Sequence, residues 1–440
     1  MRAVDIIGKK RNKEANTEAE IRFLVNGFVN GEVADYQMSA YLMAVCLNGM
    51  TEEETEDLTR IMIESGDVIK LDKIPFKKAD KHSTGGVADT TTLILAPIVA
   101  ACGGYVAKLS GKGLGATGGT IDKLESVKNL DTQCDGEKFE RLVSELHLCV
   151  ASQTASLVPA DKLMYALRDV TATVDSIPLI ASSIMSKKIA AGADVIVLDV
   201  KFGNGAFMKT VDEAEALAAA MVKIGKRMGR KTVAILTDMN EPLGTAVGNG
   251  LELKEAIDAL SCRIDKNSKL MQVSLFIAEQ MLILSDVAKT EEEAQNLIDE
   301  ALKSGTALNK LKSLCEALGG DTACFENTDL LTKTEKQIPV YLNKTGYVES
   351  VDALKIGNAA CLLGAGRQKK TDSIDYSVGI VLLKQKGDYV KLGEAVATLY
   401  VNDEKHIKEA EKLVKEAFAL NCTKQEHKSS IYKVINFEKI

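Results

Sequence analysis

The chain has 440 residues, with 62 acidic and 55 basic side chains and a formal net charge of -7. This length predicts two or three domains, and the acidic balance argues against a nucleic-acid-binding protein while it allows a local basic pocket for a small molecule. No apolar run approaches the roughly 18 residues that a membrane helix needs, the nine cysteines include no CxxC pair, and the chain opens without a signal sequence, so a protein of the reducing cytoplasm is expected.

The N-terminal part is predicted to be helical. Thr17 with Glu20 and Thr51 with Glu54 match the capping-box pattern, and each pair precedes apolar positions at helical spacing. Beyond residue 66, short apolar runs alternate with glycine-rich turns and helical patterns, which is typical of parallel α/β units. Strands are expected at 105–109, 195–200 and 232–237, and a helical stretch at 159–191 between them predicts a return to the helical domain.

The last hundred residues have a third pattern. Expected strands at 347–351, 379–383 and 389–400 precede a closing helix near 404–419, which is typical of an α+β unit. The chain is therefore predicted to be a multidomain α/β and α+β protein with three parts: a helical domain (1–66 and 160–192), a larger α/β domain with a mostly parallel sheet (67–159 and 193–334), and a small C-terminal α+β domain (335–440).

Two glycine-rich segments are the first candidates for a binding site. The first covers residues 81–92, reads KHSTGGVADTTT and runs into an apolar helix expected at 91–102. Glycines allow the backbone to approach a ligand closely, hydroxyls donate hydrogen bonds, and a helix N-terminus offers free N–H groups and a positive dipole end. The pattern favours an anion, with a simple turn capped by Ser and Thr as the alternative.

The second segment covers residues 110–120, reads SGKGLGATGGT and holds five glycines in eleven residues. Lys108 and Ser110 lie two residues apart, so they share one face at the end of the preceding strand. The carboxyl ends of parallel strands meet at one edge of a sheet, and the two segments are therefore expected to face one crevice. Neither segment matches a Walker A loop or the GxGxxG fingerprint, so no nucleotide cofactor is expected.

A helix is predicted from Ser176, as its N-cap, to Gly192, with Pro178 just inside its start. On it Ile180, Ser183, Ile184 and Lys187 form one stripe at helical spacing. A purely structural stripe rarely includes a lysine, although Lys187 at the edge of the stripe could also extend into solvent.

Four motifs resemble those of one enzyme family. Residues 110–125 (SGKGLGATGGTIDKLE) resemble the signature of the thymidine and pyrimidine-nucleoside phosphorylase family, and 81–86 (KHSTGG), 167–171 (LRDVT) and 182–188 (SSIMSKK) resemble its other motifs. The resemblance extends over nearly the whole chain. It implies a pentosyltransferase of pyrimidine salvage, a homodimer that cleaves uridine, thymidine and deoxyuridine with inorganic phosphate to the free base and α-D-ribose or deoxyribose 1-phosphate.

The resemblance also implies roles for single residues. Phosphate would be held by cationic and hydroxyl side chains, namely Lys81, Ser83, Thr92, Lys108, Ser110 and Thr120. The nucleoside would contact Arg168, Ser183, Lys187, Leu114, Tyr165 and Phe207. His82, Arg168 and Lys187 would be catalytic, because a pyrimidine leaves as an anion that fixed cations and a proton donor stabilise. From the residues alone, core packing is an equal alternative for Leu114, Tyr165 and Phe207, as is a strand-end role for His82.

A potassium ion is implied by the resemblance alone. Its expected ligands are four main-chain oxygens and one carboxylate, from Ala88, Thr90, Leu243, Ala246 and Glu255. Glu255 could equally be a surface acid.

The chain departs from the family at three positions. Lys112 stands where relatives usually carry arginine, Ala116 where they carry histidine, and Ala88 where they often carry glycine. A lysine keeps the charge of arginine but loses its planar fork. Two rival functions stay open from the sequence, an anthranilate-type phosphoribosyltransferase and a non-catalytic nucleoside- or phosphate-binding protein.

Overall fold

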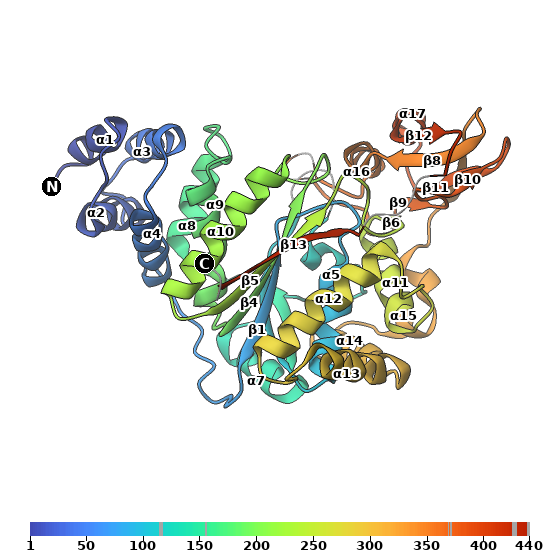
Figure 1. Ribbon diagram of the computed structural model, residues 1–440, viewed down its shortest axis with the longest axis horizontal. Helices are drawn as coiled ribbons and strands as arrows, with labels where there is room; N and C mark the ends of the chain where they lie inside the picture. The colour runs from blue at the N-terminus through green and yellow to red at the C-terminus, as the bar shows by residue number, and fades with distance from the viewer. Residues whose placement is uncertain (114–117, 155, 368, 370–371, 425–428, 438–440) are drawn as a thin grey trace.

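The computed structural model describes residues 1–440 except 114–117, 155, 368, 370–371, 425–428 and 438–440. A helical bundle lies at one end of the molecule, a central sheet with helices on both faces follows, and a small unit of short strands lies at the other end (Figure 1). Within the described residues, no helix combines the length and the apolar character that crossing a membrane requires.

The helical bundle combines two separate parts of the chain. It consists of α1 (Ala3–Arg11), α2 (Glu18–Val29), α3 (Asp35–Asn48), α4 (Glu52–Glu64), α8 (Pro159–Arg168) and α9 (Ile177–Ala190). Both predicted capping boxes are present, at Thr17 with Glu20 and at Thr51 with Glu54. Helix α9 packs against α4, and α8 against α2 and α3, so these two helices lie with the four N-terminal ones.

The central sheet has the strand order β13-β5-β4-β1-β2-β3. Its strands are β1 (Lys78–Ser83), β2 (Tyr105–Ser110), β3 (Leu148–Ser152), β4 (Val195–Phe202), β5 (Lys231–Asp238) and β13 (Ile431–Asn436). The first five run parallel, and β13 pairs antiparallel with β5. The strands expected at 105–109, 195–200 and 232–237 are thus confirmed, and His82 and Ser83 lie at the end of a strand rather than in a loop.

Helices cover both faces of this sheet. In the buried strand β4, Ile196 and Leu198 pack with the cluster of α9 and α10 (Val211–Arg227), whereas Val195 and Val197 pack with the cluster of α5 (Thr91–Ala101) and α12 (Lys269–Leu284). Because helices bury both faces of β4, apolar residues point to each of its faces. The remaining helices of this part are α6 (Thr120–Leu124), α7 (Gly136–Leu146), α11 (Asn249–Leu260), α13 (Glu291–Lys303), α14 (Thr306–Ala317), α15 (Ala323–Glu326) and η1 (Thr328–Leu331).

The small unit contains two antiparallel sheets, ordered β10-β8-β12 and β6-β9-β11-β7. Its elements are β6 (Ala246–Val247), β7 (Lys336–Tyr341), β8 (Gly346–Val351), α16 (Ala353–Leu362), β9 (Gly379–Leu382), β10 (Tyr389–Val390), β11 (Ala395–Val401), α17 (Ile407–Ala417) and β12 (Phe418–Asn421). The expected strand at 389–400 is interrupted around Gly393, which has a φ of 81°.

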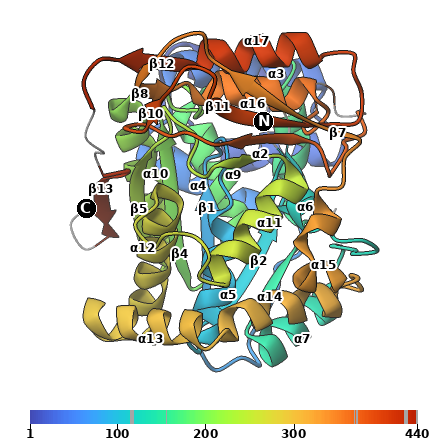
Figure 2. The ribbon, with the colours of Figure 1, turned by 90° about the vertical axis from the view of Figure 1, so that its right-hand side faces the viewer.

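Two strands cross the expected domain boundaries. Strand β6 comes from the segment 193–334 but pairs with β9 of the small unit, and β13 comes from the segment 335–440 but lies beside β5 at the edge of the central sheet (Figure 2). The expectation that 335–440 forms one closed unit is therefore wrong for its last strand. Pairing with β13 covers an edge of the sheet that would otherwise expose unpaired backbone groups. The other boundaries stay predictions.

Candidate active site

Three strands of the central sheet end side by side at one edge. Strands β1, β2 and β4 end at Ser83, Ser110 and Phe202, and both glycine-rich segments continue from this edge into the helices α5 and α6. The crevice at the carboxyl ends of parallel strands is the usual ligand site of such sheets. The edge therefore brings the two expected phosphate-binding segments together.

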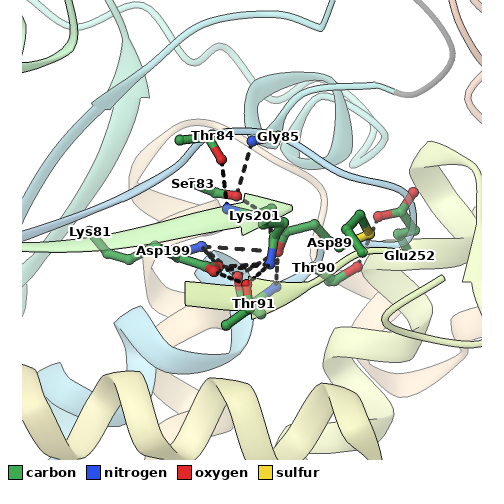
Figure 3. A network of polar contacts seen from close by, with 12 residues as sticks. Lys81, Ser83, Thr84, Gly85, Asp89, Thr90, Thr91, Asp199, Lys201 and Glu252 are labelled. Carbon is green, nitrogen blue, oxygen red and sulfur yellow. Dashed lines mark hydrogen bonds and ion pairs between the residues drawn. The ribbon is translucent and has the colours of Figure 1, made fainter. Parts of the chain in front are cut away.

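The first segment rests on a buried network of ion pairs (Figure 3). Lys81 Nζ donates to Thr91 Oγ1 at 2.6 Å and lies 3.2 Å from Asp199 Oδ2. Lys201 Nζ lies 2.9 Å from the same carboxylate oxygen. Lys81, Asp199 and Lys201 are at most 1% exposed, so the ammonium of Lys81 is held in one position by a carboxylate that solvent does not reach.

Asp89, in the first glycine-rich segment, also belongs to this network. Its carboxylate accepts from Ser83 Oγ at 2.5 Å and from Thr91 Oγ1 at 2.6 Å. Burial alone would raise the pKa of Asp89, but the charges of Lys201, Lys81 and Lys123 outweigh burial and hold it well below its usual value. Asp89 is thus ionised and fixes Ser83, one of the expected phosphate ligands. Thr92, another, is buried at the start of α5.

His82 is half-buried beside four lysines. Burial, and then the charges of Lys188, Lys108, Lys187 and Lys81, lower the pKa of His82 well below its usual value. The imidazole is therefore neutral near pH 7 and can donate a hydrogen bond through one ring nitrogen. A neutral ring can polarise the base through a hydrogen bond, whereas the proton donor expected at His82 would need the imidazolium form.

Lys108 lies beneath the loops. Its Nζ donates to the carbonyl oxygen of Lys81 at 2.5 Å and is 3.8 Å from Asp80 Oδ1. Burial first, and then the charge of Lys188, lower the pKa of Lys108 to about 7. In this structure the ammonium supports the backbone of Lys81, while Ser110 lies two residues further along, at the half-buried end of the strand.

The second glycine-rich segment is held by a carboxylate on the helix that follows it. Thr120 is the first residue of α6, and the carboxylate of Asp122 on the same helix accepts from the backbone N–H groups of Gly113 at 2.6 Å and Gly119 at 2.9 Å. Lys112 is half-exposed and forms an ion pair with Glu125 at 2.7 Å. Leu114 and Ala116 lie outside the described residues.

The expected base-binding residues lie on α8 and α9. Lys187 Nζ lies 2.5 Å from Asp161 Oδ2 and donates to Ser183 Oγ at 2.8 Å, so two of the three expected groups are together. The third, Arg168, is only 2% exposed and donates to three main-chain carbonyls, those of Thr173 (3.1 Å), Leu179 (3.1 Å) and Val174 (2.8 Å). It braces the turn between the two helices.

A cavity of about 910 Å³ joins the helices to the second segment. Lys187, Asp161 and Tyr165 line it from the bundle, and Gly111 and Ser152 line it from the sheet edge. Its volume is within the usual range for small-molecule sites. Phe207 is 40% exposed after β4 and does not line this cavity.

Glu255, one of the expected cation ligands, is buried rather than a surface acid, and its Oε1 accepts from the backbone N–H of Ala246, another of them, at 3.3 Å. Its Oε1 accepts from Thr245 N and Thr245 Oγ1, both at 2.6 Å, while its Oε2 is buried and lacks a hydrogen-bond partner. Burial raises the pKa of Glu255 to about 7. Ala88, Thr90, Leu243 and Ala246 are buried as well, and Ala88 adopts a φ of 56°. A buried carboxylate oxygen without a hydrogen-bond partner fits a hard cation as its partner.

Reasoning from sequence missed several supporting residues, namely Asp80, Asp89, Asp161, Asp199 and Lys201. One signal was present, since Asp199 and Lys201 interrupt an otherwise apolar strand, and charged residues are seldom buried without partners.

Comparisons with known proteins agree with this architecture. Family models match three segments: "Glycosyl transferase family, helical bundle domain" at residues 4–66, "Glycosyl transferase family, a/b domain" at 76–308, and "Pyrimidine nucleoside phosphorylase C-terminal domain" at 347–421. The anthranilate phosphoribosyltransferase from Thermus thermophilus has a TM-score of 0.59 at 20% identity, over 72% of this chain and 100% of that chain. That likeness concerns the fold alone.

Two similar relatives cover most of the chain. The pyrimidine-nucleoside phosphorylase of Staphylococcus haemolyticus is 54% identical over 92% of this chain and 93% of its own length. That of Geobacillus stearothermophilus is 52% identical over 92% of this chain and 93% of its own length. With these relatives and the matching C-terminal model, the chain belongs to the pyrimidine-nucleoside phosphorylase family.

Proposed function

We propose that this chain catalyses the reversible phosphorolysis of pyrimidine nucleosides such as uridine, thymidine and deoxyuridine. The observation that carries the proposal is the cavity in which Lys187 and Asp161 face Gly111 of the second glycine-rich segment. A cation suited to a departing pyrimidine thus lies across from a segment suited to phosphate. The same proposal includes a homodimer in the reducing cytoplasm.

The proposed reaction is one displacement at C1′ of the sugar. Phosphate would be held by Lys81, Ser83, Thr92, Lys108, Ser110 and Thr120. One of its oxygens forms a bond to C1′ on the face opposite the base as the C1′–N1 bond breaks through an oxocarbenium-like state, and the bonding electrons leave with the pyrimidine. A single displacement inverts C1′ and gives the α-sugar 1-phosphate, and the chain supplies no covalent nucleophile.

The bundle residues would act on the leaving group. Negative charge develops on the O2, N3 and O4 edge of the pyrimidine, where Lys187, Ser183 and Arg168 would stabilise it more in the transition state than in the ground state. Tyr165, which lines the cavity, would contact the ring. Neutral His82 would donate a hydrogen bond to the base, which leaves as an anion and then takes up a proton from water.

A potassium ion would be held by the main-chain oxygens of Ala88, Thr90, Leu243 and Ala246 and by Glu255. When bound, it supplies a fixed positive charge that balances this carboxylate and orders the first glycine-rich loop. The support for it is the buried, unpartnered Oε2 of Glu255.

The test is the release of uracil from uridine and of thymine from thymidine, with and without inorganic phosphate. Release that depends on phosphate and yields the sugar 1-phosphate is expected. Equal release in phosphate-free buffer would indicate a hydrolase, and nucleoside binding without any product would indicate a binding protein. Turnover of phosphoribosyl diphosphate with anthranilate would favour the phosphoribosyltransferase.

A further inference from the structure

The C-terminal unit reaches the second glycine-rich segment through Arg367. This residue follows α16 in the chain, and its side chain is only 12% exposed. Its Nη1 lies 2.8 Å from Asp122 Oδ1 and donates to the carbonyl oxygen of Gly113 at 3.2 Å. One guanidinium therefore contacts both the segment and the carboxylate that holds the segment.

Asp122 is the link between the arginine and the backbone of the segment. It is fully buried, and its Oδ2 accepts from the N–H groups of Gly113 and Gly119, so one carboxylate group ties the two ends of the segment together. A buried carboxylate is costly without a cation. Arg367 supplies that cation from more than two hundred positions away in the chain.

A second set of contacts comes from the same stretch of the chain. Asn249 Nδ2 donates to the carbonyl oxygen of Ala365 at 2.9 Å, and Asn249 lies against Gly118, where an added Cβ would meet its Oδ1 at 1.8 Å. Tyr376 OH donates to Glu125 Oε2 at 3.3 Å, and Glu125 in turn pairs with Lys112. Ala365, Arg367 and Tyr376 thus all contribute contacts to this region, and of these three Arg367 is the cation.

We propose that Arg367 is a positioning residue for phosphate, which acts through Asp122 on the backbone of the segment that carries Ser110 and Thr120. The proposal rests on the proposed function and adds a task for the C-terminal unit. Without Arg367, the buried carboxylate of Asp122 loses its ion-pair partner, and Gly113 loses the hydrogen bond from the guanidinium. Because a buried charge without a partner is unfavourable, Asp122 moves toward solvent and away from Gly113 and Gly119, and the segment loses the geometry that phosphate needs.

The first experiment measures kcat and the two KM values of Arg367→Gln. The KM for phosphate should rise by about tenfold, the typical effect of losing a charge-assisted hydrogen bond, while the KM for uridine stays close to that of the unmodified protein. The Tm should fall, because Asp122 is left buried without its ion-pair partner, but the protein should stay folded at the assay temperature. Arg367→Lys keeps the charge and should recover most of the loss. The matched control is Lys336→Gln, which removes an exposed ion pair with Glu404 in the same unit and should leave both KM values unchanged.

The second experiment needs no turnover. Hydrogen exchange of peptides that cover residues 110–120 should be faster in Arg367→Gln, and inorganic phosphate should protect these peptides less than it does in the unmodified protein. The double variant Asp122→Asn/Arg367→Gln removes both charges. Its increase in exchange rate should be smaller than the sum of the increases in the two single variants.

An unchanged KM for phosphate with unchanged exchange would overturn the proposal. So would a parallel loss in both KM values and in Tm that Arg367→Lys does not repair, or failure of the single and double variants to fold, because either would make the arginine merely structural. If the unmodified protein binds phosphate but cleaves no nucleoside, the proposed function fails on its own, and the exchange data still decide the role of Arg367.

Discussion

The ammonium of Lys187 lies 2.5 Å from the buried carboxylate of Asp161 and donates to Ser183 at 2.8 Å. The carboxylate fixes the position of this side chain, and both residues line the cavity. The donor expected to face a departing pyrimidine is thus fixed before a substrate arrives, as preorganised electrostatic stabilisation requires.

Replacing this cation should slow the reaction strongly. Lys187→Met should lower kcat/KM for uridine by about 10²-fold or more, the usual cost of removing a preorganised donor. The Tm should also fall, because Asp161 is left buried without its ion-pair partner. Lys303→Met, at a side chain that is 78% exposed, serves as the control. Near-normal turnover of Lys187→Met with an intact fold would make the α9 stripe merely structural.

Arg168 should behave differently, because its three nitrogens donate to main-chain carbonyls. Arg168→Met would leave these buried carbonyls unpaired and should lower the free energy of unfolding by about 2–4 kcal/mol, in addition to reducing kcat/KM. Urea denaturation beside steady-state kinetics separates the two effects. Full stability of this variant would contradict the bracing role seen here.

The sequence predicts elements whose signals are local. The capping boxes at Thr17 and Thr51 and the apolar strand 195–200 depend on neighbouring residues only, and the structure confirms them. Strand β1 escaped prediction because it reads KADKHS, and its charges are buried in ion pairs with other elements. Strand β13 escaped because its partner β5 is almost two hundred residues away.

The candidate site, too, can be predicted from the sequence only in part. The glycine-rich segments and the Ser183–Lys187 pair follow from motif and helical spacing. The carboxylates that hold them do not, since Asp161, Asp199 and Asp122 act across elements that only folding brings together. The backbone role of Arg168 is equally invisible in sequence, because main-chain acceptors leave no residue pattern.

Removing potassium should destabilise the protein through Glu255. A ligand that binds only the folded state raises stability by mass action, so replacing potassium chloride with tetramethylammonium chloride at equal ionic strength should lower Tm. Glu255→Gln should abolish this difference, since the orphaned carboxylate oxygen is gone. A salt response that is identical in both proteins would leave the cation site without support.

The pH dependence of kcat/KM for phosphate should reflect the titration of Lys108. Burial lowers its pKa to about 7, so the side chain is a cation below that pH and becomes neutral above it. Attraction for phosphate through Lys108 is therefore present below about pH 7 and lost as the pH rises through this value. In the profile of kcat/KM for phosphate, the advantage of the unmodified protein over Lys108→Met should shrink as the pH rises from one unit below this pKa to one unit above it. A constant ratio would contradict this assignment.

The last prediction concerns the sugar of the substrate. The unmodified enzyme should cleave the ribonucleoside uridine as well as the deoxyribonucleoside thymidine. A lysine at position 108 can donate a hydrogen bond to a 2′-hydroxyl, whereas a methionine would leave that hydroxyl unpaired. A site that leaves a buried polar group of the substrate unpaired binds that substrate poorly. In the structure the ammonium donates to the carbonyl of Lys81, close to the first glycine-rich loop. Lys108→Met should therefore reduce kcat/KM for uridine more than for thymidine. Equal losses would confine Lys108 to supporting Lys81 and phosphate, and negligible uridine cleavage by the unmodified protein would overturn the prediction outright.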